Sequence, residues 1–184
     1  MKELSMHILD IAQNSVRAKA HNITIIVKEN IIDNLFEFSI KDDGTGIPKD
    51  IFEDILNPFT TSRTMRKVGL GLPLLDDTCN LCNGNLSIET IVNEGTALKA
   101  VMEYNHIDRP PMGDIVATIA MLITSNSDIN IKYIHYYNDS TFDISTKEIK
   151  EVLGDDIPLT DINVIQWLKE FLKENIDELN YEKA

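Results

Sequence analysis

A strand-like run over residues 35–41 ends directly in the turn Asp42-Asp43-Gly44-Thr45-Gly46-Ile47-Pro48. Phe36, Phe38 and Ile40 alternate with polar residues, which predicts a strand with one buried face. Glycine has no Cβ, so the backbone of such a turn can approach a flat or charged ligand closely. A carboxylate beside it can accept a hydrogen bond from an amino group. The turn is therefore a candidate ligand site, and an ordinary strand-to-loop turn is the alternative.

The size and charge of the chain limit what such a site can serve. A chain of 184 residues with 43% hydrophobic residues can bury one sizeable core, or one core with a small appendage. A net charge of −13 argues against a protein that binds nucleic acid, because phosphate contacts need a basic face. No apolar run reaches membrane-spanning length and the N-terminus lacks a signal peptide's apolar block, so we expect a cytoplasmic protein.

Residues 4–18 contain neither proline nor glycine and repeat apolar side chains at helical spacing. His7, Asp10, Asn14 and Arg17 recur every three or four residues, so they share one face of this helix. On this face a carboxylate lies one turn before an amide, and a histidine and an arginine flank the pair. A helix face that only contacts solvent does not need this particular set of functional groups. The face is thus a second candidate site, with a plain polar surface as the alternative.

A polar, basic segment without periodicity covers residues 59–67 and is followed at once by Gly69-Leu70-Gly71. A helix is predicted over residues 72–81. Glycines directly before a helix leave its first N–H groups free at the positive end of the helix dipole, where a phosphate can bind. The segment is either a loop that closes over an anion or a solvated loop.

The remaining pattern predicts strands over residues 22–29, 86–92 and 96–104. In residues 1–105 the predicted order of elements is a helix, a hairpin, loops, a second helix and a second hairpin. This order predicts an α+β unit whose helices cover one face of a sheet. Residues 106–184 form an α+β extension. It contains a stiff connector near its start, residues 109–113, followed by a helix, a hairpin and two helices. The last of these is amphipathic, and it either packs on its own chain or binds a partner.

Cys79 and Cys82 form a Cys-x-x-Cys pair at the C-terminal end of the predicted helix over residues 72–81. This spacing occurs in redox pairs and in half of a zinc site. No second cysteine pair exists and no histidine is close in sequence to complete a metal site. The alternative is that both thiols are small side chains facing the core.

Four pieces stand in a fixed order: the helix with Asp10 and Asn14, the turn 42–46, the basic loop ending in 69–71, and Gly95-Thr96. This set resembles the GHKL superfamily, the ATP-binding domains of DNA gyrase, the large heat-shock chaperone, histidine kinases and mismatch-repair ATPases. The resemblance covers about residues 3–104. It implies a two-layer α/β sandwich of the Bergerat type, with a mixed sheet and ATP and Mg²⁺ as cofactors.

The resemblance also implies roles for individual residues. Asn14 matches the asparagine that coordinates Mg²⁺, and Asp42 matches the aspartate that accepts the adenine amino proton. Gly44 and Gly46 match the glycines under the base and sugar, and Thr96 looks like the threonine at the adenine edge. The implied ATP-binding set is Asn14, Arg17, Asp42, Gly44, Gly46, Ile47, Thr60, Thr61, Ser62, Arg63, Lys67, Gly69, Leu70, Gly71, Leu72 and Thr96.

Asp10 stands where the hydrolysing members carry a glutamate general base, and it is one methylene shorter. A base must reach hydrogen-bond distance of the attacking water before its pKa matters. Arg17 stands where kinases of the superfamily often have lysine, and Lys67 stands where a first glycine is common. Because the predicted helix begins almost at Met1, the resemblance implies a stand-alone module, as in anti-sigma-type serine kinases.

Three outputs remain open for such a module. It is a slow ATPase whose lid closure controls a protein partner, a serine or histidine protein kinase acting on a separate protein, or a nucleotide sensor without turnover. The sequence does not identify the partner or the oligomeric state.

Overall fold

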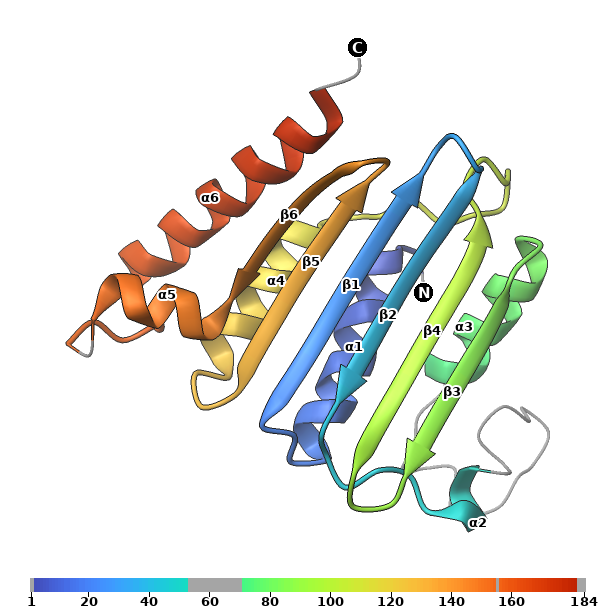
Figure 1. Ribbon diagram of the computed structural model, residues 1–184, viewed down its shortest axis with the longest axis horizontal. Coiled ribbons are helices and arrows are strands. Elements are labelled where there is room, and N and C mark those ends of the chain that lie inside the picture. The colour runs from blue at the N-terminus through green and yellow to red at the C-terminus, as the bar shows by residue number, and fades with distance from the viewer. Residues whose placement is uncertain (1, 53–70, 155, 182–184) are drawn as a thin grey trace.

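The computed structural model describes residues 2–52, 71–154 and 156–181 and contains one six-stranded mixed sheet with the strand order β3-β4-β2-β1-β5-β6 (Figure 1). Along the chain, the elements are α1 (Leu4–Arg17), β1 (Asn22–Asn30), β2 (Leu35–Asp42), α2 (Lys49–Phe52), α3 (Gly71–Leu81), β3 (Asn85–Ile91), β4 (Gly95–Glu103), α4 (Ile115–Ser125), β5 (Asn130–Tyr137), β6 (Ser140–Ser145), α5 (Thr146–Leu153) and α6 (Ile162–Tyr181).

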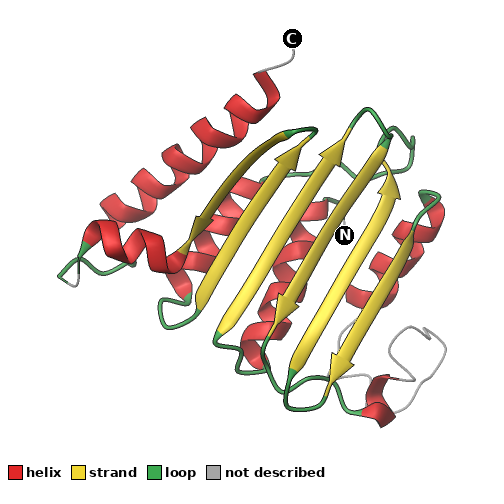
Figure 2. Cartoon of the chain, viewed as in Figure 1, coloured by secondary structure: helices red, strands yellow, loops and turns green. Residues whose placement is uncertain are grey.

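The helices α1, α3 and α4 lie on one face of the sheet, and in the described part of the chain no helix covers the other face (Figure 2). The alternation in β2 explains this layering, because Phe36, Phe38 and Ile40 all point to the helical face and are buried. Leu4 and Ile8 of α1 are fully buried against them. The two-layer α+β architecture expected from the sequence is therefore confirmed.

The residues after 105 extend this same sheet. β5 pairs with β1 in parallel, from Asn22 opposite Asn130 to Glu29 opposite Tyr137, and β6 then pairs with β5 in antiparallel. The long helix α6 packs on its own chain, since Leu168 and Leu172 are fully buried. The division of the chain into two domains at residue 105 stays a prediction.

The connector between β4 and α4 is fixed to the start of α1. The N–H groups of Leu4 and Ser5 donate to the carbonyl oxygens of Pro111 and Met112 over 2.9 and 2.8 Å. These are two of the four N–H groups that an α-helix leaves without an internal acceptor. The connector therefore caps the helix that carries Asp10 and Asn14.

None of the helices in the described part of the chain is both long and apolar enough to cross a membrane.

Candidate functional site

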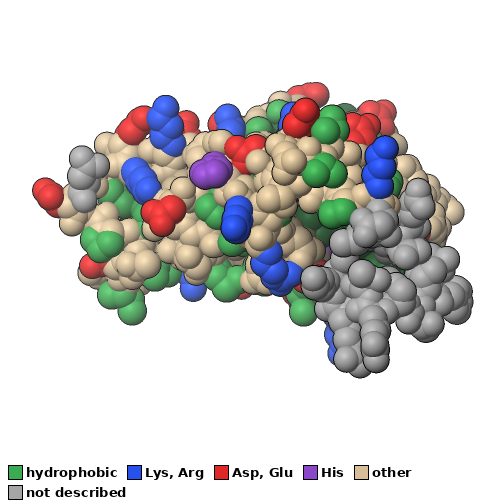
Figure 3. Space-filling view, turned by 90° about the horizontal axis from the view of Figure 1, so that it is seen from below, with side chains coloured by type: hydrophobic (Ala, Val, Ile, Leu, Met, Phe, Trp, Pro, Cys, Tyr) green, Lys and Arg blue, Asp and Glu red, His purple; other side chains and the backbone are tan. Residues whose placement is uncertain are grey.

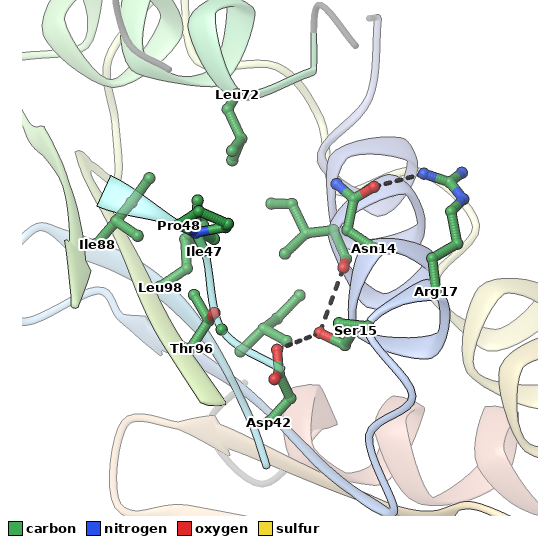
Figure 4. A pocket seen from close by; sticks show the side chains of 14 residues that line it. Asn14, Ser15, Arg17, Asp42, Ile47, Pro48, Leu72, Ile88, Thr96 and Leu98 are labelled. Carbon is green, nitrogen blue, oxygen red and sulfur yellow. Dashed lines mark hydrogen bonds between the residues drawn. The ribbon is translucent and has the colours of Figure 1, made fainter. Parts of the chain in front are cut away.

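A cavity of about 270 Å³ opens between α1, the end of β2 and the first residues of β4. Figure 4 shows Asn14 and Arg17 on one side of it, Ile88 and Pro48 on the other, and Leu72 facing them from the start of α3. Of the residues predicted to bind a nucleotide, the structure brings together Asn14, Arg17, Asp42, Gly46, Ile47, Leu72 and Thr96. Ile88 and Leu98 add apolar walls.

Asp42 is the buried charge of this cavity, with only 8% of its surface exposed. Its Oδ2 accepts a hydrogen bond from the Ser15 hydroxyl over 2.6 Å, and its Oδ1 accepts one from the N–H of Gly44 over 2.9 Å. Each carboxylate oxygen has a second lone pair that remains available. The two donors therefore fix the orientation of the carboxylate while leaving it able to accept a hydrogen bond from a ligand.

The glycines of the turn are required by backbone packing. A Cβ on Gly44 would lie 2.8 Å from the carbonyl oxygen of Ala18, and one on Gly46 would lie 2.3 Å from that of Ile91. Gly46 also has a φ of +66°, a conformation that favours glycine. Glycine is therefore required at both positions for the turn to pack against α1 and the β3–β4 hairpin. The sequence alone does not show this packing requirement.

Thr96 lies directly opposite Asp42 in the pairing of β4 with β2. Its hydroxyl is 3.2 Å from the hydroxyl of Thr90, which also accepts a hydrogen bond from the N–H of Ile47 over 2.8 Å. Thr90 thus connects the Thr96 hydroxyl to the glycine turn.

Ser15 and Thr90 are site residues that the sequence analysis missed. Both could have been found from register: Ser15 follows Asn14 on the buried side of a helix, and Thr90 faces Thr96 across a hairpin with a short turn.

Asn14 and Arg17 are hydrogen-bonded to each other at the mouth of the cavity. A guanidinium N–H of Arg17 donates to Oδ1 of Asn14. This amide oxygen is the atom that would ligate a hard cation such as Mg²⁺. The described residues contain no group of three or more His, Cys, Asp or Glu side chains suited to a metal ion. A magnesium ion here would therefore need oxygens from water and from its ligand.

Asp10 lies one helical turn before Asn14, is partly buried and does not line the cavity. His7, one further turn away, is 1% exposed, and neither ring nitrogen has a hydrogen-bond partner among the described residues. Burial, with a smaller contribution from the N-terminal charge, lowers the pKa of His7 to about 4. His7 is therefore a neutral ring in the interior, and its place on the polar helix face is a packing position.

Gly71 is the first residue of α3 and is buried. Gly44 lies next to the side chain of Asp42. Neither glycine lines the cavity. The remaining predicted site residues lie outside the described part of the chain: Thr60, Thr61, Ser62, Arg63, Lys67, Gly69 and Leu70. Figure 3 views the molecule from the end at which β1 begins and β2 ends, and several Lys and Arg side chains lie on this face of an otherwise acidic protein.

Cys79 and Cys82 are both free thiols and fully buried. Burial raises the pKa of Cys79 to about 12 and also raises that of Cys82. The thiolate is the reactive form of cysteine, so these thiols are poor nucleophiles and metal ligands. The structure thus favours the core-packing interpretation over the redox pair.

Comparisons with known proteins agree with this geometry. A family model described as "Histidine kinase-, DNA gyrase B-, and HSP90-like ATPase" matches residues 2–106. The chain is 36% identical over 63 residues to the sensor kinase CckA of Brucella abortus, and 26% identical over 119 residues to the non-motile and phage-resistance protein of Caulobacter vibrioides. The matches cover 34% and 60% of this chain but only 7% and 14% of those relatives.

Two solved structures match the chain, and the first of them resembles it at the level of the fold. The N-terminal domain of a DNA repair protein has a TM-score of 0.60 and 17% identity, covering 84% of this chain and 58% of that one. The Aquifex aeolicus MutL ATPase domain complexed with ADP has a TM-score of 0.47 and 12% identity, covering 100% of this chain and 99% of that one.

Proposed function

The chain belongs to the family of histidine kinase-, DNA gyrase B- and HSP90-like ATPases, and from this premise we propose that it binds ATP with Mg²⁺ between α1 and the end of β2, and that the bound nucleotide controls a protein partner. The observation that carries the proposal is the buried, oriented carboxylate of Asp42 in a cavity that also contains Asn14. The family resemblance of the sequence motifs implies that these two residues hold opposite ends of one nucleotide.

The adenine base occupies the inner part of the cavity. Its exocyclic amino group donates to Asp42, and the Thr96 hydroxyl faces the same edge. Ile47, Ile88 and Leu98 supply apolar surfaces for the flat ring. Guanine has a carbonyl oxygen where adenine has the amino group. This oxygen would face the Asp42 carboxylate, and because both groups are hydrogen-bond acceptors, the site rejects guanine. Small-molecule sites usually have volumes of roughly 300–1,000 Å³, and the first cavity lies close to the lower end of this range. This volume fits a base and a sugar, with the phosphates outside the cavity.

The phosphates extend from the base toward Arg17 and the first turn of α3, where the helix dipole favours negative charge. Arg17 prefers a phosphate to an amide oxygen, because the charged pair forms two parallel hydrogen bonds. With Arg17 bound to the phosphates, Oδ1 of Asn14 would be free to hold Mg²⁺. The metal would neutralise part of the charge of the triphosphate.

The segment 59–67, which resembles the ATP lid of the family, would contribute Thr60, Thr61, Ser62, Arg63 and Lys67 to this part of the site. Gly69 and Leu70, from the glycine pair that follows it, would complete it. This assignment rests on the resemblance of the sequence motifs.

Slow hydrolysis resets the protein, with Asp10 activating water. The place of Asp10 outside the cavity lining supports slow turnover, since a general base must reach the attacking water. A second candidate function is phosphate transfer to a separate protein. The sensor kinase of Brucella abortus, 36% identical over its matched segment, supports that candidate.

Three measurements on the purified full chain separate the outputs. Phosphate release from ATP identifies an ATPase, ³²P transfer to a co-purified protein identifies a kinase, and saturable ATP binding with neither identifies a sensor. Absence of saturable binding of ATP and Mg²⁺ would contradict all three.

A further inference from the structure

A second and larger cavity, of about 730 Å³, lies at the far end of β1 and β5, where α4 and α6 approach the sheet (Figure 1). Glu29 of β1 lines it. Glu29 is six residues along β1 from Ile23, the residue paired with Asp42, so it lies about 20 Å along the strand from the first cavity. The two cavities are therefore separate sites, and the second has a volume usual for small-molecule binding.

Glu29 ends a chain of buried hydrogen bonds. Its Oε1 is 2.9 Å from Nε2 of His135, and Nδ1 of His135 is 2.8 Å from the hydroxyl of Tyr133. Burial raises the pKa of Tyr133, so this hydroxyl stays protonated and can donate to Nδ1. His135 thus lies between the two groups, with one ring nitrogen at each of them.

Among the described residues, His135 is the ion-pairing partner of Glu29, and no Lys or Arg pairs with it. The side chain of Glu29 is only 15% exposed. A buried carboxylate without a Lys or Arg partner is costly, and a ligand that supplies the cation recovers part of that cost.

The walls of the cavity suit the same kind of ligand. Tyr104 and Tyr137 place aromatic rings at the cavity, and the guanidinium of Arg109 already lies 4.6 Å from the centre of the Tyr104 ring. Met112 and Val116 present apolar surface. Four carboxylates and two lysines line the cavity, so its net charge is negative. Aromatic rings next to a carboxylate attract a cation through the negative faces of the rings.

We propose that this second cavity binds a small organic cation, an ammonium or guanidinium group carried on an apolar body, with Glu29 as its counter-ion. The cation donates to the carboxylate of Glu29, the tyrosine rings flank it, and the apolar body packs on Met112 and Val116. Binding here is independent of whether the first cavity binds ATP.

The test uses phenethylamine, whose ammonium group is carried on an apolar body, and 2-phenylethanol as an uncharged molecule of similar shape. In an NMR titration of the full chain, phenethylamine shifts the amide signals of residues 112–116 and 135 in a saturable way. The signals of Asp42 and Thr96 stay in place, and 2-phenylethanol does not saturate the cavity. Equal binding of the two compounds would overturn the proposal.

Glu29→Gln keeps an acceptor for His135 and removes the charge, so the affinity for phenethylamine falls about tenfold or more. Glu89→Gln is the matched control, because Glu89 is an exposed carboxylate on β3 that attracts cations only at long range. An unchanged affinity in Glu29→Gln, or an equal loss in Glu89→Gln, would overturn the proposal. If Glu29→Gln fails to fold, Val116→Phe decides: it narrows the cavity, and the proposal requires it to weaken binding.

Discussion

The hydroxyl of Ser15 donates a hydrogen bond of 2.6 Å to Oδ2 of Asp42, and both side chains are buried. The bond joins α1 to the end of β2, the two elements that form the first cavity. It therefore couples the position of the helix that carries Asn14 to the carboxylate proposed to select adenine.

Replacing Ser15 with alanine removes this donor and leaves Asp42 with the N–H of Gly44 alone. A hydrogen bond to a charged group contributes roughly 1.5–3 kcal/mol, so we expect Ser15→Ala to weaken ATP binding about tenfold or more. Isothermal titration calorimetry measures the change. Ser5→Ala is the control, since Ser5 is a buried serine at the other end of the same helix. Equal losses in the two variants would show that Ser15 acts on helix stability alone.

Asn14→Ala removes the amide oxygen proposed to ligate Mg²⁺, and it also leaves Arg17 free of its partner. We expect ATP binding in EDTA to be nearly unchanged and the gain in affinity on adding Mg²⁺ to disappear. Gln13→Ala, at the exposed neighbouring position, should keep that gain. A magnesium effect that survives in Asn14→Ala would place the metal elsewhere.

Asp10→Asn tests turnover separately from binding. Because Asp10 does not line the cavity, we expect the affinity for ATP to stay within about twofold of the parent protein while any phosphate release is lost. Continuous phosphate detection gives the rate. Undiminished hydrolysis in Asp10→Asn would remove this carboxylate from the mechanism.

The lowered pKa of His7 predicts that the folded protein loses stability on acidification. The pKa of this side chain is about 4 in the folded protein, below the 6.5 of an ordinary histidine, so between these pH values the unfolded chain binds a proton that the folded chain does not. Stability therefore falls as the pH drops from about 6.5 to about 4, and His7 adds no further loss below that. The size of the effect is on the order of 1–3 kcal/mol.

Urea unfolding at several pH values measures this loss. We expect His7→Leu to reduce it and His21→Gln, at an exposed position, to leave it unchanged. Identical pH profiles for His7→Leu and the parent protein would show that His7 is protonated equally in both states.

The local elements of this fold could be predicted from the sequence because their signals are local. The alternation of Phe36, Phe38 and Ile40 predicts the buried face of β2, and the helical spacing over residues 4–18 predicts α1. The parallel pairing of β1 with β5 could not be predicted, because Asn22 and Asn130 are far apart in the chain and no turn chemistry links them.

The site was predictable to the same extent. Asn14, Asp42 and Thr96 were assigned from motifs and lie around one cavity. Ser15 and Thr90 belong to none of the motifs, and only the register of α1 and of the β3–β4 hairpin relates them to Asn14 and Thr96. His7 was assigned to the functional face because helical periodicity shows which residues align but not which of them are buried.

The measurement that tests the account most directly is the binding of ATP and GTP, each with Mg²⁺, to the parent protein and to Asp42→Asn. We predict one saturable site that prefers ATP to GTP by at least about tenfold in the parent protein, and loss of that preference together with weaker ATP binding in the variant. Equal affinity of the two nucleotides for the parent protein, or an unchanged preference in Asp42→Asn, would contradict the assignment of Asp42 to the adenine base.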